Sequence, residues 1–283
     1  MAKALMLGSG AALPAKGRFN TSLAILEGAR TLLIDCAQPA SELLYHHGVD
    51  IVSVDTVVIT HMHADHVTGV GQLAHLKHIL FDNKPPRVFL DRNDGFIKDN
   101  LRHPHRNELN NVNPWLNIYV PAGVEETMTQ YLSALYMRPE VFAKYSVSVL
   151  PYGEGEFHSD ENFKLVAYPN AHIREFYPEL QNTDAVLSSY TIMIETLGRK
   201  CLYSSDLASF EEIDHLVDGA DTIFVEGAHF SPSELIRFAQ EHKLEQVFVH
   251  HILATREEEF ARLARELAQA NVKLTFDGFE VEL

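Results

Sequence analysis

Four potential metal ligands stand within six consecutive positions of this chain, in the segment His61-Met62-His63-Ala64-Asp65-His66. The segment follows the apolar run 55–59 and precedes a helix-like run that begins at Val67, so it lies where a strand gives way to a helix. Imidazole and carboxylate are ligands that zinc and similar ions prefer, and this spacing supplies two of them to each of two neighbouring ions. A His-rich surface turn is the alternative, but the position at the end of a buried strand favours a metal site.

Length and composition are those of a globular α/β protein. The chain has 283 residues, 46% hydrophobic and 22% charged, which leads us to expect one domain over 1–283 with a continuous core. The N-terminal apolar stretch is too short for a secretory signal, and we expect no membrane span. Only Cys36 and Cys201 are present, which excludes a disulfide framework and fits a reducing, cytoplasmic location.

Charge constrains the partners. The chain carries 39 acidic and 23 basic residues, a formal net charge of −16, which repels polyanions at long range. A nucleic-acid polymer is therefore an unlikely partner, whereas bound divalent ions could still attract a small anionic substrate. The sixteen histidines point the same way, because histidine is the commonest metal ligand.

Short apolar runs alternate with helical patterns in both halves of the chain, which predicts an α/β layered fold. Capping boxes mark three predicted helix starts, at Ser209, Ser231 and Thr255. Apolar residues at helical spacing from Phe260 to Leu267 predict one last helix with a buried face. We expect strands at residues 4–7, 22–26, 31–35, 56–60, 147–150, 164–168, 190–195, 201–204, 222–226, 246–250 and 273–276.

Residues from about 82 to 114 interrupt this alternation, with turn and breaker signals such as Pro85-Pro86 and Asn93-Asp94-Gly95. A segment of this length inside a compact domain is usually functional, so we interpret it as an insertion that could form an active-site lid. A surface excursion that packs on its own side is the alternative.

Several motifs, taken in order, resemble the metallo-β-lactamase superfamily along nearly the whole chain. They are Leu7-Gly8-Ser9-Gly10, Leu33-Ile34-Asp35, the 61–66 segment, Asn170-Ala171-His172, Tyr203-Ser204-Ser205-Asp206 and Val249-His250-His251. The resemblance implies a four-layer αββα sandwich with a dinuclear metal centre along one edge between two sheets. The glycine turn, Asp206 and Phe224-Val225-Glu226 look most like the branch of the tRNA 3′-processing endonucleases and small cyclic phosphodiesterases.

The resemblance also implies the ligands. His61, His63 and His172 would hold the first ion, Asp65, His66 and His251 the second, and Asp206 would bridge them. Zinc is the expected metal, with manganese or iron as alternatives. A loop histidine at His172 and a capping aspartate at Asp206 are the ordinary alternatives, and His250 could replace His251, because adjacent strand residues point to opposite faces.

Asp35 and Thr60 are candidates to orient the ligands, since a metal-bound imidazole normally donates its other N–H to a carboxylate, carbonyl or hydroxyl. For Asp35, initiation of a turn is an equally good interpretation. Asp65 and His229 are the predicted catalytic residues. His229 could give a proton to a leaving group or could cap the following helix turn.

The implied function is a phosphodiesterase that acts on a small or cyclic phosphodiester through a metal-bridging hydroxide. Ser205, where that branch usually has glycine, and the lack of a His-Ser-Thr motif and of a Lys-rich arm disfavour tRNA cleavage. Hydrolysis of a lactone, thioester or lactam at the same site stays open, as does a non-catalytic metal-binding or redox protein. Cys36 and Cys201 are interpreted as inert core thiols. Homo-oligomers are compatible with the sequence.

Overall fold

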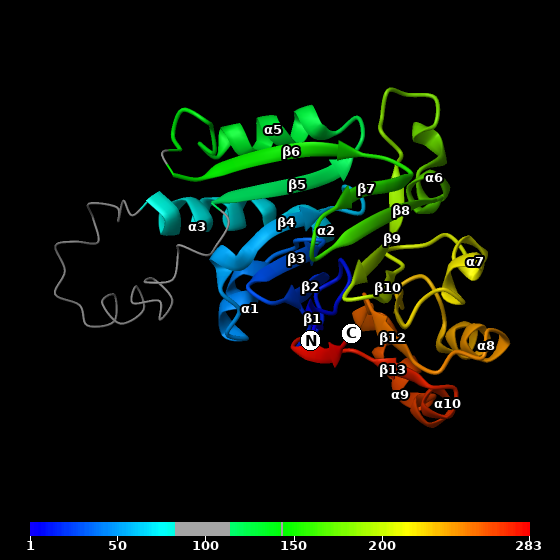
Figure 1. Cartoon of the computed structure of the whole chain (residues 1–283). Helices are drawn as coiled ribbons and strands as arrows, with labels where there is room; N and C mark the ends of the chain where they lie inside the picture. Colours follow the sequence, from blue (N-terminus) through cyan, green and yellow to red (C-terminus); the bar gives the residue numbers. More distant parts are fainter. Residues whose placement is uncertain (83–113, 143) are drawn as a thin grey trace.

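Two seven-stranded sheets lie face to face in the computed structural model, which describes residues 1–82, 114–142 and 144–283 (Figure 1). The first sheet has the order β14-β1-β2-β3-β4-β5-β6, formed by Phe279–Glu282, Lys3–Gly8, Ser22–Glu27, Arg30–Ile34, Val54–Val58, Trp115–Pro121 and Ser146–Tyr152. The second has the order β13-β12-β11-β10-β9-β8-β7, formed by Val272–Leu274, Val247–His250, Thr222–Glu226, Arg199–Tyr203, Ser189–Thr196, Lys164–Asn170 and Gly155–Ser159.

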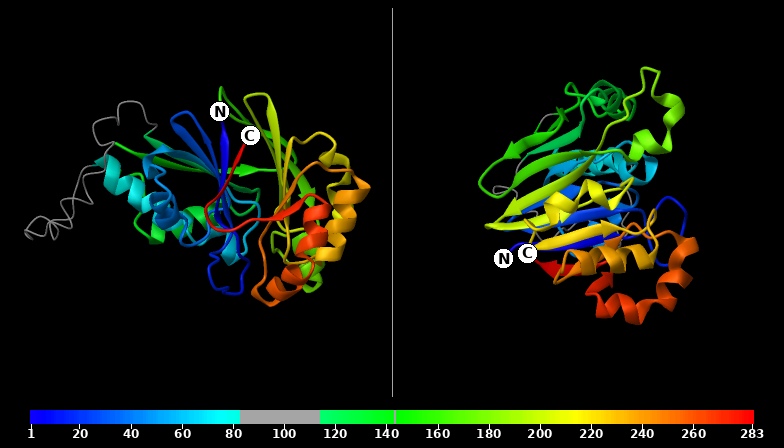
Figure 2. Two further views of the ribbon diagram at one scale, coloured as in Figure 1. Left: turned by 90° about the horizontal axis from the view of Figure 1, so that it is seen from below. Right: turned by 90° about the vertical axis from the view of Figure 1, so that its right-hand side faces the viewer.

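Helices cover the outer face of each sheet, and three apolar clusters separate the four layers (Figure 2). One cluster lies between the first sheet and helices α1 (Ala40–His46), α3 (Val70–Asp82) and α5 (Glu125–Ala134). The second fills the space between the sheets. The third lies between the second sheet and helices α7 (Asp214–Val217), α8 (Pro232–Glu241), α9 (Glu257–Arg262) and α10 (Ala264–Gln269). The predicted four-layer αββα sandwich is confirmed.

Strand direction places one end of both sheets at the same edge. Strands β3 to β6 run parallel, as do β10 to β13, and β8 points the same way as β10 because each is antiparallel to β9. Loops and short helices follow the carboxyl ends of these strands, among them α2 (Ala64–Val67), α6 (His172–Phe176) and the 3-10 helices η4 (Pro178–Leu180), η5 (Phe210–Glu212) and η6 (Ala254–Arg256). A further 3-10 helix, η1 (Ile51–Ser53), precedes β4.

A buried lysine anchors α3 to the first sheet. The Lys77 ammonium donates to the carbonyl oxygen of Val54 and, at 3.0 Å, to that of Trp115. It also lies over the rings of Phe81 and Tyr145. These contacts connect α3 to the amino-terminal ends of β4 and β5.

Three sequence predictions need correction. Strands β5, β7 and β14 were not expected, and in β14 apolar and acidic residues alternate at a sheet edge with no fully buried position. The predicted last helix is two helices, because the backbone leaves the helical conformation at Leu263. The predicted capping box at Thr255 does not form, since α9 begins after Arg256, whereas those at Ser209 and Ser231 are present.

The predicted insertion at about 82–114 lies, apart from its ends, outside the described residues. Among the residues that the structure does describe, none of the helices combines the length and apolar character needed to cross a membrane.

Candidate metal centre

The strand ends at the shared edge carry the predicted site residues. His61 and His63 follow β4, His172 follows β8, Asp206 follows β10 and His251 follows β12. Three residues at strand ends here have a left-handed backbone, namely Asp35 (φ 58°), Ser205 (φ 56°) and His251 (φ 53°). Non-glycine residues rarely adopt this conformation, and it concentrates at functional sites, where the chain must turn sharply to present a side chain.

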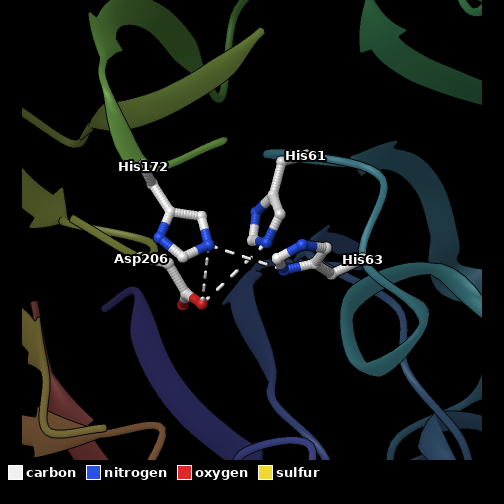
Figure 3. Close-up of side chains that lie close together, drawn as sticks. All are labelled: His61, His63, His172 and Asp206. Carbon is white, nitrogen blue, oxygen red and sulfur yellow. Dashed lines mark hydrogen bonds and ion pairs between the residues drawn. The ribbon is translucent and has the colours of Figure 1, made fainter. Parts of the chain in front are cut away.

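One group of ligand atoms comes from His61, His63, His172 and Asp206 (Figure 3). One ligand atom from each lies within 4.8 Å of those of the others. His172 Nε2 is 3.5 Å from Asp206 Oδ2 and 3.5 Å from His63 Nδ1, and His61 Nε2 is 3.9 Å from Asp206 Oδ2. These separations suit donors that surround one ion at about 2.0–2.2 Å each.

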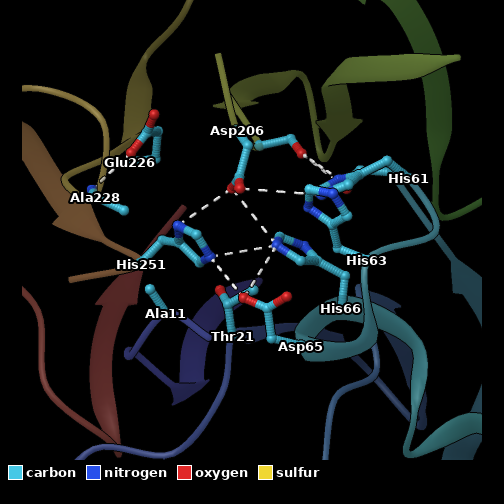
Figure 4. Close-up of polar contacts among 12 residues, drawn as sticks. Ala11, Thr21, His61, His63, Asp65, His66, Asp206, Glu226, Ala228 and His251 are labelled. Carbon is cyan, nitrogen blue, oxygen red and sulfur yellow. Dashed lines mark hydrogen bonds and ion pairs between the residues drawn. The ribbon is translucent and has the colours of Figure 1, made fainter. Parts of the chain in front are cut away.

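A second group comes from Asp65, His66 and His251 (Figure 4). His251 Nε2 is 3.1 Å from Asp65 Oδ2 and 3.3 Å from His66 Nε2. His66 Nε2 lies 3.9 Å from Asp65 Oδ2. Three donors from two different sheets thus converge on one point.

Asp206 faces both groups with different oxygens. Its Oδ2 faces His61 and His172, whereas its Oδ1 lies 3.5 Å from His66 Nε2 and 3.2 Å from His251 Nδ1. Figure 4 shows this carboxylate above the pair formed by His66 and His251. A carboxylate in this position can be shared by two neighbouring ions.

Asp35 makes several hydrogen bonds next to the candidate ligands that follow β4. Its carboxylate accepts from the Thr60 backbone N–H at 2.9 Å and the Thr60 hydroxyl at 3.0 Å, and it lies 2.7 Å from His66 Nδ1. Tyr203 donates to the same carboxylate at 3.2 Å. Because Nδ1 of His66 is held in this way, its Nε2 is turned into the site.

The buried charges oppose one another. Burial alone would lower the pKa of His66, but the carboxylates of Asp35 and Asp206 raise it well above its usual range. Burial would raise the pKa of Asp206, yet His251 and His66 hold it well below the usual value. For His61, burial and the neighbouring imidazole of His66 lower the pKa well below its usual range. His61 and Asp206 therefore favour the neutral imidazole and the ionised carboxylate that ligation requires.

Unpartnered polar atoms show that the residues fit a metal. His61 Nε2 and Asp206 Oδ1 are buried, and within the described residues neither has a hydrogen-bond partner. Buried polar groups without partners are rare and costly in folded proteins. Together with the facing nitrogens of His66 and His251, they form a set of nitrogen and oxygen donors of the kind that zinc binds.

His229 lies at the rim of the same site. Its Nδ1 is 2.8 Å from Glu226 Oε1, and its ring lies 4.9 Å from that of His172. Burial would lower the pKa of His229, but the hydrogen bond and charge of Glu226 raise it above its usual value. The buried Glu226 carboxylate also accepts from the backbone N–H groups of Ala228 and His229, so it fixes the rim segment as well as the ring.

The structure places all seven predicted ligands together and distinguishes the two adjacent histidines. His251 lies in the site, whereas the His250 ring stacks on Tyr203 and its Nδ1 lies 3.3 Å from the Thr21 hydroxyl. The two cysteines, Cys36 and Cys201, are buried, and burial raises the pKa of both thiols.

Sequence reasoning missed three contributors. Glu212 accepts from Ala171 N–H at 2.6 Å and from Ala208 N–H at 3.0 Å, which connects the turn before His172 to the turn after Asp206. Phe176 and Tyr177 contact histidines of the site. The capping box at Ser209 draws attention to Glu212 but not to these longer contacts.

A family model described as anti-Pycsar protein Apyc1 matches residues 2–267. A protein of that description from Bacillus phage BSP38 is 25% identical over 276 residues, covering 92% of each chain.

Solved structures support the fold. The metallo-β-lactamase fold protein YhfI from Bacillus subtilis superposes with a TM-score of 0.68 at 16% identity, over 100% of this chain and 99% of that one. The short form of human tRNase Z gives a TM-score of 0.65 at 17% identity, over 99% of this chain and 98% of that one. The fold is that of the metallo-β-lactamase superfamily.

Proposed function

The chain belongs to the anti-Pycsar protein Apyc1 family of metal-dependent hydrolases, and from this premise we propose that it is a dinuclear phosphodiesterase that opens a cyclic nucleotide. The reaction is hydrolysis of one P–O bond of a cyclic phosphodiester to a phosphomonoester. The observation that carries the proposal is the Asp206 carboxylate, whose two oxygens face two separate groups of donors.

Under this proposal, His61, His63 and His172 would hold one ion, Asp65, His66 and His251 would hold the other, and Asp206 would be shared by both. Zinc fits the donor set. When bound, such ions supply Lewis acidity, which lowers the pKa of a water molecule to about 7 and offsets the negative charge of a phosphodiester.

The chain's own residues orient these groups and move a proton. Asp35 and Thr60 hold the rings of His66 and His61 through their Nδ1 atoms. Glu226 raises the pKa of the His229 ring, which favours the protonated imidazole. Since Nδ1 faces Glu226, Nε2 of His229 is the proposed donor of a proton to the departing oxygen as the P–O bond breaks.

Charge supports a small substrate. With a formal net charge of −16, the chain repels a polyanion along its surface, whereas a single phosphodiester needs only the local positive charge that bound ions would supply. A cyclic nucleotide meets this condition and a tRNA does not.

The experiment combines metal counting with a substrate panel. Purified protein reconstituted with zinc or manganese is expected to bind two ions per chain by elemental analysis and to hydrolyse cyclic nucleotides faster than lactones, thioesters or lactams. His61→Ala is expected to lose an ion and the activity, and the control His46→Ala, which removes an exposed histidine of α1, is expected to keep both. Hydrolysis of lactones alone would reject the phosphodiesterase, and one ion per chain would reject the dinuclear centre.

A further inference from the structure

Two exposed aromatic side chains stand at the rim of the candidate metal centre. Phe176 ends α6, four residues after His172, so the two side chains lie on the same face of this helical turn. The Phe176 ring centroid is 4.7 Å from that of His172 and 4.7 Å from that of His229. Tyr177 follows directly, and its ring is 5.6 Å from that of His63. We call Phe176 and Tyr177 the rim aromatic pair.

The pair is open to solvent although the histidines beside it are not. Phe176 is 50% exposed and Tyr177 is 36% exposed, whereas His172 is 1% exposed. One edge of each ring therefore contacts the site and the remainder faces outward. Figure 1 shows α6 beyond the end of β8, which it follows in the chain. Large aromatic surface beside a cluster of convergent polar groups is typical of a ligand site.

Chemistry suggests what the pair would receive. A cyclic nucleotide has a charged phosphodiester and a flat, apolar base joined by a ribose, so one end of it requires cations and the other a stacking surface. Aromatic side chains stack on bases without strong preference, because every base presents a π face. The donor groups supply the first requirement, and the rim aromatic pair lies directly beside them.

We infer that the rim aromatic pair holds the base of the substrate while its phosphodiester lies at the metal centre. This inference rests on the proposed function. The pair acts on substrate binding and takes no part in proton transfer. A site built in this way would favour nucleotides over other phosphodiesters with the same reacting group.

The alternative is that the two rings only support the histidines they contact. The two interpretations differ in what a substitution changes. Support for His172 and His63 would affect metal retention and the turnover of every substrate. Base stacking would affect only substrates that carry a base.

The test compares a 3′,5′-cyclic nucleotide with methyl ribofuranoside 3′,5′-cyclic phosphate, which keeps the reacting ring and lacks the base. With zinc-loaded protein, Phe176→Ala and Tyr177→Ala are each expected to raise KM for the nucleotide about tenfold to a hundredfold. KM and kcat for the base-free compound are expected to stay within about threefold, and the zinc content is expected to be unchanged. Phe176→Trp is expected to restore the nucleotide KM, because it restores a stacking surface.

The matched control is Tyr136→Ala, which removes a 77% exposed aromatic ring beyond the end of α5, on the outer side of the other sheet. This variant is expected to leave KM and kcat unchanged for both substrates. Equal losses for both substrates, or no change for the nucleotide, would overturn the inference while leaving the phosphodiesterase intact. If the unmodified protein hydrolyses neither compound, the proposed function itself fails.

Discussion

The two sheets position the residues that they contribute to the candidate metal centre in different ways. The candidate ligands of the first sheet, which we call the first-sheet ligands, are His61, His63, Asp65 and His66. They come from one continuous segment, next to a dense set of side-chain hydrogen bonds around Asp35. The candidate ligands of the second sheet, which we call the second-sheet ligands, are His172, Asp206 and His251, and they come from three separate strand ends. The backbone is left-handed at Ser205, directly before Asp206, and at His251 itself. Glu212 connects two of the three turns.

This difference predicts which substitutions should disturb the candidate ligands most. In the first sheet, position depends on buried side chains, so loss of one hydrogen bond leaves a polar group without a partner. In the second sheet, position depends more on backbone conformation and on partly exposed contacts, which tolerate a weakened side chain better. Variants that remove one support at a time can test this contrast.

The largest effect is expected at Asp206, which faces both groups of donors. Asp206→Asn keeps the size of the side chain but removes the negative charge shared by both groups of donors. Activity is expected to fall about a thousandfold or more, because ion-mediated charge stabilisation is worth several kcal/mol. Elemental analysis is expected to show fewer than two ions per chain. Asp218→Asn, at an exposed carboxylate after α7, is the control, and an active Asp206→Asn protein with both ions would contradict the shared role.

The next comparison sets Asp35 against Glu212. Asp35→Asn leaves His66 Nδ1 without its charged partner and is expected to lower metal affinity or activity about tenfold to a hundredfold. Glu212→Gln keeps one acceptor oxygen for its three backbone donors, the N–H groups of Ala171, Ala208 and Ser209, and is expected to cost less than about tenfold. Chelator competition and initial rates measure both variants. Equal losses would show that the second sheet relies on side chains as heavily as the first.

The first-sheet ligands could be predicted from the sequence because they are contiguous. Four donors in six positions after an apolar run predict a metal site in almost any α/β fold. His172, Asp206 and His251 could be predicted only through their order and their places at strand ends. The choice of His251 over His250 depends on the chain turning at His251, where φ is 53°. Strand alternation alone cannot show such a turn.

Most of the fold could be predicted from the sequence, but some strands at the sheet edges and the contacts of the loops could not. Strand β14 alternates acidic and apolar residues with little burial, so its apolar signal is weak. Glu212 contacts Ala171, Phe176 contacts His229 and Tyr177 contacts His63, each across segments far apart in the chain. No local pattern encodes these contacts. The resemblance to the endonuclease branch predicts glycine where Ser205 stands, and the backbone there suits glycine, since φ is 56°.

A third test concerns Lys77, which anchors the helix that follows the first-sheet ligands. Burial lowers the pKa of its ammonium to about 7, despite the opposing carboxylates of Asp55 and Asp50. Between about pH 7 and the usual lysine value near 10.4, the unfolded chain therefore binds more protons than the folded one, so stability due to this group rises with pH.

The measurement compares Lys77→Met with the unmodified protein by denaturant unfolding at pH 7, 8 and 9. The difference in unfolding free energy is expected to shift in favour of the unmodified protein by at most about 1.4 kcal/mol per pH unit. Other titrating groups cancel in the comparison because both proteins contain them. Parallel pH profiles would mean that Lys77 stays charged when folded.

The smallest effect is expected at Ser205, where one stabilising effect of a substitution opposes two destabilising ones. Ser205→Gly relieves a left-handed residue, worth about 1–2 kcal/mol, but loses the hydroxyl that donates to Thr60 at 2.7 Å, worth about 1 kcal/mol. It also increases the freedom of the unfolded chain by about 0.4–1 kcal/mol. Stability is expected to stay within about 1 kcal/mol of the unmodified protein. Ser205→Ala loses the hydroxyl and keeps the unfavourable φ, so it is expected to be less stable than Ser205→Gly. If the two variants unfold at the same denaturant concentration, backbone conformation contributes little to the position of Asp206, and the second-sheet ligands are held by side chains after all.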